Sequence, residues 1–183
     1  NKLTIAVLAV LLVLVILVVV ILCMIFGGGS WKTPINNVMD VLNDGDGKAY
    51  EELMPPYYKD MADALDGIID ISDEDFDEEA ENQRDRLTKK YGDDAEISYE
   101  VVKKTAVDSD DIDSYNDMSD LASVLSVKKA KKYKLTKAYK VKIKYTIEGE
   151  DADKTDKTTV IVGKMDGTWV LLDEGDLPIS TGF

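Results

Sequence analysis

The sequence predicts an α+β domain in which several helices pack on an antiparallel sheet, preceded by one membrane-spanning helix. Three observations predict this fold class. The chain opens with a long uncharged apolar segment, apolar residues then recur at helical spacing, and they finally alternate with polar residues as in half-buried strands. We expect three parts: a transmembrane anchor at residues 1–26, a flexible linker at 27–32 and one extracytoplasmic domain at 33–183.

The expected anchor is the segment from Leu3 to Phe26, which has 24 residues, no charge and one hydroxyl. At about 1.5 Å per residue such a helix reaches roughly 36 Å, enough to cross a hydrocarbon core of about 30 Å. A cleavable signal peptide would have a shorter apolar region, and Leu22 stands where a lipoprotein signal would carry a small residue before Cys23. Lys2 on one side and the acidic domain on the other favour a single-pass protein of the cell membrane with its C-terminal domain outside.

The residues around this anchor add two expectations. Residues 27–30 read GGGS, which is typical of a flexible joint, and Trp31 and Lys32 are the kinds of residue found at membrane interfaces. Pilins of the type IV class also begin with a long apolar helix, but Ile5 stands where they usually carry glutamate. A pilin-like filament subunit is therefore kept as an alternative.

The composition excludes several classes of chemistry. The 183 residues contain no histidine and a single cysteine inside the apolar segment, so Ser–His or Cys–His catalysis and the usual zinc and haem ligands are excluded. A net charge of −14 and a pI near 4.4 argue against a nucleic-acid binder, because phosphate binding needs a basic surface. We expect no cofactor and no nucleic-acid partner, and we assign no catalytic and no metal-binding residue.

Four helices are predicted in the first half of the domain. Thr33 and Pro34 start the first one, as an N-cap hydroxyl and a proline at the first helical position. The second runs from about residue 48 to 53 and stops before two prolines, and the third carries an apolar stripe between residues 58 and 69. The fourth, from about residue 73 to 91, has acids in its first turns, bases in its last turn and a glycine after it.

The second half predicts an antiparallel sheet interrupted by one helix. Residues 96–107 are predicted to form a strand, and residues 111–127 place apolar side chains on one helical face. From residue 139 to 147, apolar and polar residues alternate almost perfectly, as in a half-buried strand. Residues 158–173 predict two strands joined by a turn at 165–167.

The segment NDGDG at residues 43–47 raises the question of a calcium site. An EF-hand loop needs acids at positions 1, 3 and 5, a glycine at 6 and a glutamate at 12. With Gly45 at position 6, Leu42 falls at position 3, and with Gly47 at position 6 it falls at position 1, so both frames lack a ligand. We therefore predict a corner between two helices, in which Asp46 caps the second, and calcium binding is not expected.

The stretch NNVMDVLNDGDGKAYEELMPP, the helices after it and the final strands ending VGKMDGTWVLLD resemble the nuclear transport factor 2-like, or SnoaL-like, superfamily of cystatin-like α+β domains. The resemblance spans most of residues 33–173 and is strongest to membrane-anchored extracytoplasmic domains of Gram-positive envelope proteins. It implies a cone-like domain in which a curved sheet wraps against helices. Enzymes of the superfamily place an acid, a histidine or a tyrosine inside the cone. Here Tyr99, Tyr139, Tyr145 and Trp169 are predicted to be core residues.

The most unusual feature is a run of nine lysines, without any acid, between residues 121 and 147. Its simplest interpretation is a solvated sheet face, on which lysines prevent pairing between sheet edges and offset the acidic helices. The alternative is a basic stripe that binds an anionic partner, such as lipid headgroups, an envelope polymer or an acidic protein. For this alternative the candidate binding residues are Lys137, Lys140, Lys142 and Lys144.

These observations together predict a membrane-anchored binding or regulatory module of the cell envelope that does not catalyse a reaction. The contrary prediction is a small-molecule-binding enzyme of the SnoaL-like type. It requires a water-accessible cavity that holds two ionisable groups with separated pKa values. The pilin-like filament subunit is the third possibility.

Overall fold

The computed structural model describes residues 29–65, 75–118 and 130–180. The expected anchor lies outside these residues, as do the parts of two predicted helices that follow residues 65 and 118. Within the described residues, no helix is both long enough and apolar enough to cross a membrane. The predicted α+β class is confirmed, because the described ranges form five α-helices and one four-stranded antiparallel sheet.

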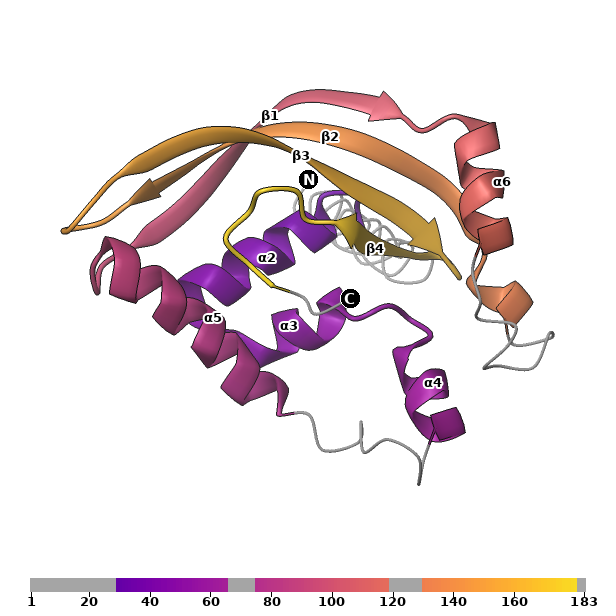
Figure 1. Ribbon diagram of the computed structural model, residues 1–183, viewed down its shortest axis with the longest axis horizontal. Coiled ribbons are helices and arrows are strands. Elements are labelled where there is room, and N and C mark those ends of the chain that lie inside the picture. The colour runs from indigo at the N-terminus through magenta and orange to yellow at the C-terminus, as the bar shows by residue number, and fades with distance from the viewer. Residues whose placement is uncertain (1–28, 66–74, 119–129, 181–183) are drawn as a thin grey trace, which may run out of the picture.

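The elements follow the predicted order, with helices first and then a sheet interrupted by one helix. The helices are α2 (Thr33–Asp44), α3 (Gly47–Leu53), α4 (Tyr58–Leu65), α5 (Phe76–Tyr91) and α6 (Ser109–Met118). The strands are β1 (Glu96–Ala106), β2 (Leu135–Glu148), β3 (Lys154–Met165) and β4 (Thr168–Asp173), and they lie side by side in the order β1-β2-β3-β4. Figure 1 shows the sheet arching over α2, α3 and α5, while α6 lies at one end of the arch.

The first helix begins one residue earlier than the sequence pattern predicts. Lys32 occupies the N-cap position of α2, so Thr33 is the first helical residue and Pro34 follows it. The predicted N-cap role of Thr33 is therefore wrong, and its hydroxyl instead accepts a hydrogen bond from the backbone N–H of Ser30 at 3.0 Å. Proline is tolerated at this position because the N–H groups of the first helical turn have no partner within the helix.

The predicted corner between α2 and α3 is confirmed. Gly45 has a φ of 65°, a left-handed conformation that glycine adopts readily, and its N–H donates to the carbonyl of Val41 at 2.9 Å. The carboxylate of Asp46 then accepts hydrogen bonds from the backbone N–H groups of Lys48 and Ala49, at 2.9 and 3.1 Å. This carboxylate therefore caps α3.

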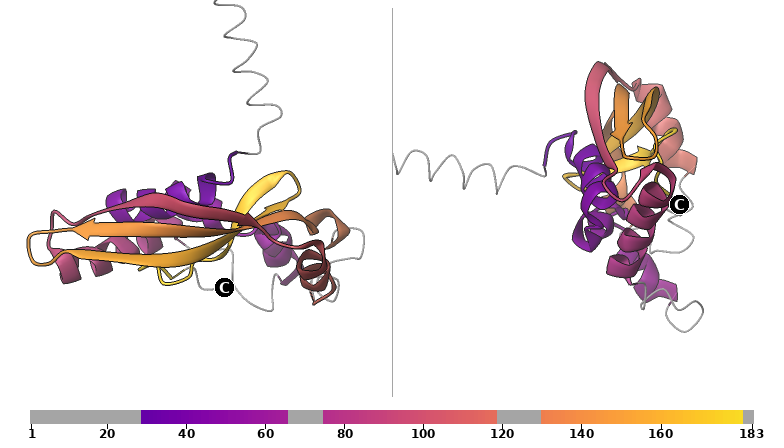
Figure 2. Two further views of the ribbon diagram at one scale, coloured as in Figure 1. Left: turned by 90° about the horizontal axis from the view of Figure 1, so that it is seen from above. Right: turned by 90° about the vertical axis from the view of Figure 1, so that its left-hand side faces the viewer.

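The alternating stretch forms β2, one of the two inner strands, as predicted. Its odd-numbered residues from Val141 to Ile147 are buried, and because side chains alternate along a strand, the lysines between them point to the other face. Figure 2 shows the three long strands running side by side along the molecule. The predicted hairpin joins β3 to β4 through Asp166 and Gly167, whose φ values of 47° and 82° suit a type I′ turn.

Apolar side chains fill the space between the sheet and the helices. Val141, Ile143 and Tyr145 of β2 are 0% exposed, as are Ile35 and Leu42 of α2. All belong to one continuous core that also includes residues of α3 and α5. The face of the sheet that looks toward the helices is therefore used mainly for packing.

The three tyrosines that were predicted to lie in the core differ in their burial. Tyr145 is fully buried, and its hydroxyl accepts a hydrogen bond from the Lys154 ammonium at 2.7 Å and donates to the carbonyl of Asp176 at 3.3 Å. Tyr99 is half-buried and donates to the side-chain oxygen of Asn36 at 2.7 Å. Tyr139 is also half-buried and packs at the margin of the core.

The segment that follows β4 returns beneath the sheet toward α5 (Figure 1). Leu177 and Ile179 are buried in the main core, at 5% and 8% exposure. Gln83 of α5 holds the end of this segment, because its amide donates to the carbonyl of Ser180 and accepts from the N–H of Ser180, both at 3.2 Å. The segment therefore completes the core on the helical side of the sheet.

Asp40, in the last turns of α2, is expected to make the stability of the fold depend on pH. Burial, followed by the charges of Asp44 and Asp46, raises the pKa of Asp40 above its ordinary value. An acid whose pKa is higher in the folded state destabilises the fold when ionised, so stability is lost as the pH rises through that pKa. Replacing Asp40 with asparagine is expected to raise the thermal midpoint at pH 7 by about 1–3 °C, with no gain below about pH 3.5. Thermal unfolding at both pH values tests this, and an equal gain at both would contradict it.

Candidate functional site

The face of the sheet that points away from α2 and α5 carries five lysines from three neighbouring strands. We call this set the lysine face: Lys103 of β1, Lys140, Lys142 and Lys144 of β2, and Lys157 of β3. Lys103 lies directly opposite Lys142, and Lys144 directly opposite Lys157, in the strand register. Like charges in directly opposed positions destabilise a sheet. The fold therefore tolerates an electrostatic cost on this face.

Acidic side chains lie near two members of the lysine face. Lys140 lies 3.8 Å from the carboxylate of Asp111 in α6. Glu100 is the register partner of Lys144, although their charged groups do not come within 4.0 Å. For Lys103, Lys142 and Lys157, the described residues provide no carboxylate within 4.0 Å. The three lie exposed on a sheet surface in an otherwise acidic protein.

The structure brings together three of the four candidate residues from the sequence. Lys140, Lys142 and Lys144 share one face, but Lys137 has the opposite parity in β2 and lies on the face of Tyr139. Two members of the lysine face were missed. Lys157 lies outside the predicted strands, because β3 begins at Lys154, four residues before the predicted start. Lys103 joins the face only because a β-bulge shifts the register of β1 after Val101.

Lys137 instead belongs to a second surface, on the helical side of the sheet where the described chain begins. We call it the aromatic–lysine cluster: Trp31, Lys32, Lys104, Lys137, Tyr139, Lys164 and Trp169. The rings of Tyr139 and Trp169 stack with centroids 5.4 Å apart, and Trp31 meets Tyr139 edge-on at 6.4 Å. All three rings are half-buried against the core.

Four ammonium groups surround these rings. Lys104 lies 4.4 Å from the centroid of Tyr139 and 4.8 Å from that of Trp31, so it bridges two rings. Lys137 lies over Tyr139 at 5.6 Å, Lys164 over Trp169 at 6.0 Å and Lys32 over Trp31 at 5.5 Å. These distances suit cation–π attraction. No carboxylate of the described residues lies within 4.0 Å of any of the four.

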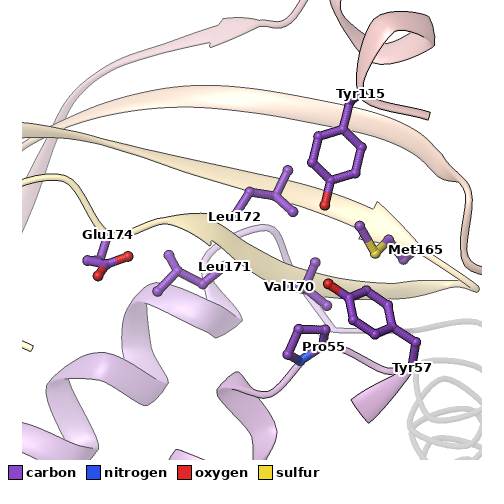
Figure 3. A pocket seen from close by; sticks show the side chains of 8 residues that line it. All are labelled: Pro55, Tyr57, Tyr115, Met165, Val170, Leu171, Leu172 and Glu174. Atoms are coloured by element: carbon purple, nitrogen blue, oxygen red, sulfur yellow. The ribbon is translucent and has the colours of Figure 1, made fainter. Parts of the chain in front are cut away.

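A small pocket lies beside β4. It has a volume of about 120 Å³ and is lined by Pro55, Tyr57, Tyr115, Met165, Val170, Leu171, Leu172 and Glu174. The hydroxyl groups of Tyr57 and Tyr115 point into it from opposite sides (Figure 3). Its volume is well below the roughly 300–1,000 Å³ of typical small-molecule sites.

The two tyrosines of this pocket both have raised pKa values. Burial raises the pKa of Tyr57, which the neighbouring Tyr115 raises further, and burial also raises the pKa of Tyr115. Both phenols therefore stay protonated at neutral pH and can donate hydrogen bonds. The pocket can hold a few water molecules or a small polar group, and Glu174 is the one carboxylate among its lining residues.

The acidic corner at residues 43–47 does not assemble a metal site within the described structure. The carboxylate of Asp46 is used to cap α3, and the side chain of Asn43 binds the backbone of Ile97. Over the described ranges, no group of three histidine, cysteine, aspartate or glutamate side chains is arranged to hold a metal ion.

Comparison of the chain with protein-family models, with curated proteins and with solved structures finds no match. The resemblance to the nuclear transport factor 2-like superfamily therefore stays a prediction. The functional argument for this protein depends on its own surfaces.

Proposed function

We propose that the chain is a membrane-anchored, extracytoplasmic binding module whose lysine face binds an anionic polymer of the cell envelope. One observation carries the proposal: Lys103 and Lys142, and Lys144 and Lys157, are placed directly opposite one another across the sheet. A solvated face needs charge, but it does not need like charges in directly opposed positions, which cost stability. A repeating anion that lies across the strands would offset that repulsion.

The geometry of the lysine face suits a polymer better than a small ligand. The face is an open sheet surface, and its charges are spread over three strands that lie roughly 4.8 Å apart. Exposed lysines act as mobile point charges and do not impose the fixed geometry of a bidentate site. Such a face favours an extended chain of phosphates or carboxylates and selects it by charge density.

The test is binding of the full chain, in detergent micelles, to immobilised poly(glycerol phosphate). The triple substitution K103Q/K142Q/K157Q removes three lysine-face charges and is expected to weaken binding by roughly tenfold or more, since an exposed ion pair contributes up to about 1 kcal/mol. Wild-type binding should also weaken as salt is raised through the physiological range.

The matched control is K104Q/K137Q/K164Q, which removes three charges from the same strands on the opposite face of the sheet. It is expected to bind the polymer within about twofold of the wild type, because screening limits the effect of distant charges. If both triple variants weaken binding equally, binding follows net charge and the lysine face is not a site. If neither weakens it, the lysines are a solvated face only.

A further inference from the structure

We propose that the aromatic–lysine cluster is a second binding surface, which contacts the headgroups of anionic lipids and holds the domain against the membrane. The proposal concerns a different face of the sheet and a different ligand from the polymer site. It stands on three observations: the unneutralised charge of the cluster, its half-buried aromatic rings and its place next to the expected anchor.

The charge of the cluster is complementary to an anionic bilayer. Lys32, Lys104 and Lys137 are exposed and Lys164 is half-buried, and no carboxylate of the described residues lies within 4.0 Å of them. This is unusual in a chain with 36 acids and 22 bases. Near an anionic surface, each lysine favours association by about fivefold, since its interaction is about 1 kcal/mol.

The aromatic rings distinguish the cluster from a purely electrostatic patch. Trp31, Tyr139 and Trp169 are half-buried, so their remaining surface lies among the lysine ammonium groups. Tryptophan and tyrosine next to lysine are typical of the boundary between headgroups and hydrocarbon, where one end of the ring is apolar and the other is hydrated. The lysine face has no ring of this kind among its members.

The position of the cluster along the chain favours a lipid over a soluble anion. Trp31 follows Phe26, the last residue of the expected anchor, by five residues. Five residues span at most about 18 Å, because an extended chain covers about 3.6 Å per residue. Contact of Trp31 with Tyr139, and of Tyr139 with Trp169, then brings these residues of β2 and β4 close to the bilayer as well.

Binding through the cluster would leave the lysine face free. Lys137 and Tyr139 are odd-numbered positions of β2, whereas the lysine-face residues of this strand are even-numbered. The two surfaces therefore lie on opposite faces of the sheet. A domain held on lipid by the cluster can therefore present the lysine face to a polymer.

The two tryptophans of the chain, Trp31 and Trp169, both belong to the cluster, so intrinsic fluorescence reports on it directly. The full chain is reconstituted in vesicles of phosphatidylcholine, or of an equimolar mixture of phosphatidylcholine and phosphatidylglycerol. In the anionic vesicles we expect a blue-shifted emission, lower quenching by acrylamide and higher quenching by brominated lipid. For K104Q/K137Q/K164Q, the equilibrium constant for binding of the cluster to lipid should fall on the order of a hundredfold. The emission of this variant in anionic vesicles should therefore resemble that in neutral vesicles.

The triple K103Q/K142Q/K157Q is the control and should keep the wild-type response to phosphatidylglycerol, and circular dichroism verifies that both variants are folded. Equal quenching in the two kinds of vesicle would overturn the proposal. So would protection that persists in K104Q/K137Q/K164Q, which would indicate that a protein surface covers the rings. Protection by soluble poly(glycerol phosphate) in neutral vesicles would assign the cluster to the polymer instead of the lipid.

Discussion

Replacing Arg84 with alanine is expected to lower the free energy of unfolding by about 3 kcal/mol. The guanidinium group of Arg84 in α5 donates to the carbonyl of Leu42 at 3.1 Å and also to the carbonyl of Ala95. Its second terminal nitrogen reaches the carbonyl of Asp93 at 3.4 Å. One side chain therefore satisfies backbone acceptors of α2 and of the loop before β1, and its charge also suits the C-terminal end of α2.

Arg86, two residues further along α5, is the matched control. It is exposed, and its replacement by alanine is expected to change stability by less than about 0.5 kcal/mol. Arg84→Lys should lie between the two, because an ammonium group keeps the charge but cannot bridge the same carbonyls with a planar fork. Urea unfolding followed by circular dichroism measures all three, and equal midpoints for the Arg84 and Arg86 variants would contradict this account.

Replacing Asn43 with alanine is expected to cost about 2–3 kcal/mol. The amide of Asn43 donates to the carbonyl of Ile97 at 2.9 Å and accepts from the N–H of Ile97 at 2.8 Å. Ile97 is only 2% exposed, so alanine at position 43 would leave a backbone donor and acceptor without partners next to the core. The first residue of the NDGDG segment is thus a link between α2 and β1.

The same urea titration tests this prediction, with Asn82→Ala as the control because Asn82 is exposed on α5. A loss below about 0.5 kcal/mol for Asn43→Ala would show that this link contributes little. The structural interpretation of the corner also predicts that calcium does not change the urea midpoint of the wild type. We expect the same midpoint in a chelator and in about 1 mM calcium, because weak extracellular calcium sites fill at that concentration. A urea midpoint that rises in calcium would contradict this interpretation and indicate that residues 43–47 bind the ion.

Local patterns predicted most elements of this fold. The alternation from residue 139 to 147 predicted β2 and the face on which its lysines lie, because one side of the strand must be buried. The glycine and aspartate at the corner predicted the end of α2 and the cap of α3, because both residues act through their own backbone or nearest neighbours.

Features that depend on contacts between distant segments could not be predicted in this way. The lysine face includes Lys103 because of a bulge whose position depends on how β1 pairs with β2. The aromatic–lysine cluster joins Trp31, Tyr139 and Trp169, which come from three separate segments of the sequence. Trp31 was assigned to the linker on sequence grounds, and only its contact with Tyr139 shows that it packs against the domain. The sequence pattern does not show that these rings meet.

The most direct test of the central claim is to map which lysines an anionic polymer covers. The full chain in detergent is acetylated briefly with and without poly(glycerol phosphate), and mass spectrometry measures the modification of each lysine. The account predicts protection of Lys103, Lys142, Lys144 and Lys157, and no change at Lys48 and Lys89, which lie exposed on α3 and α5. Uniform protection of all lysines, or protection of the helical lysines alone, would contradict the assignment of the lysine face as the binding site.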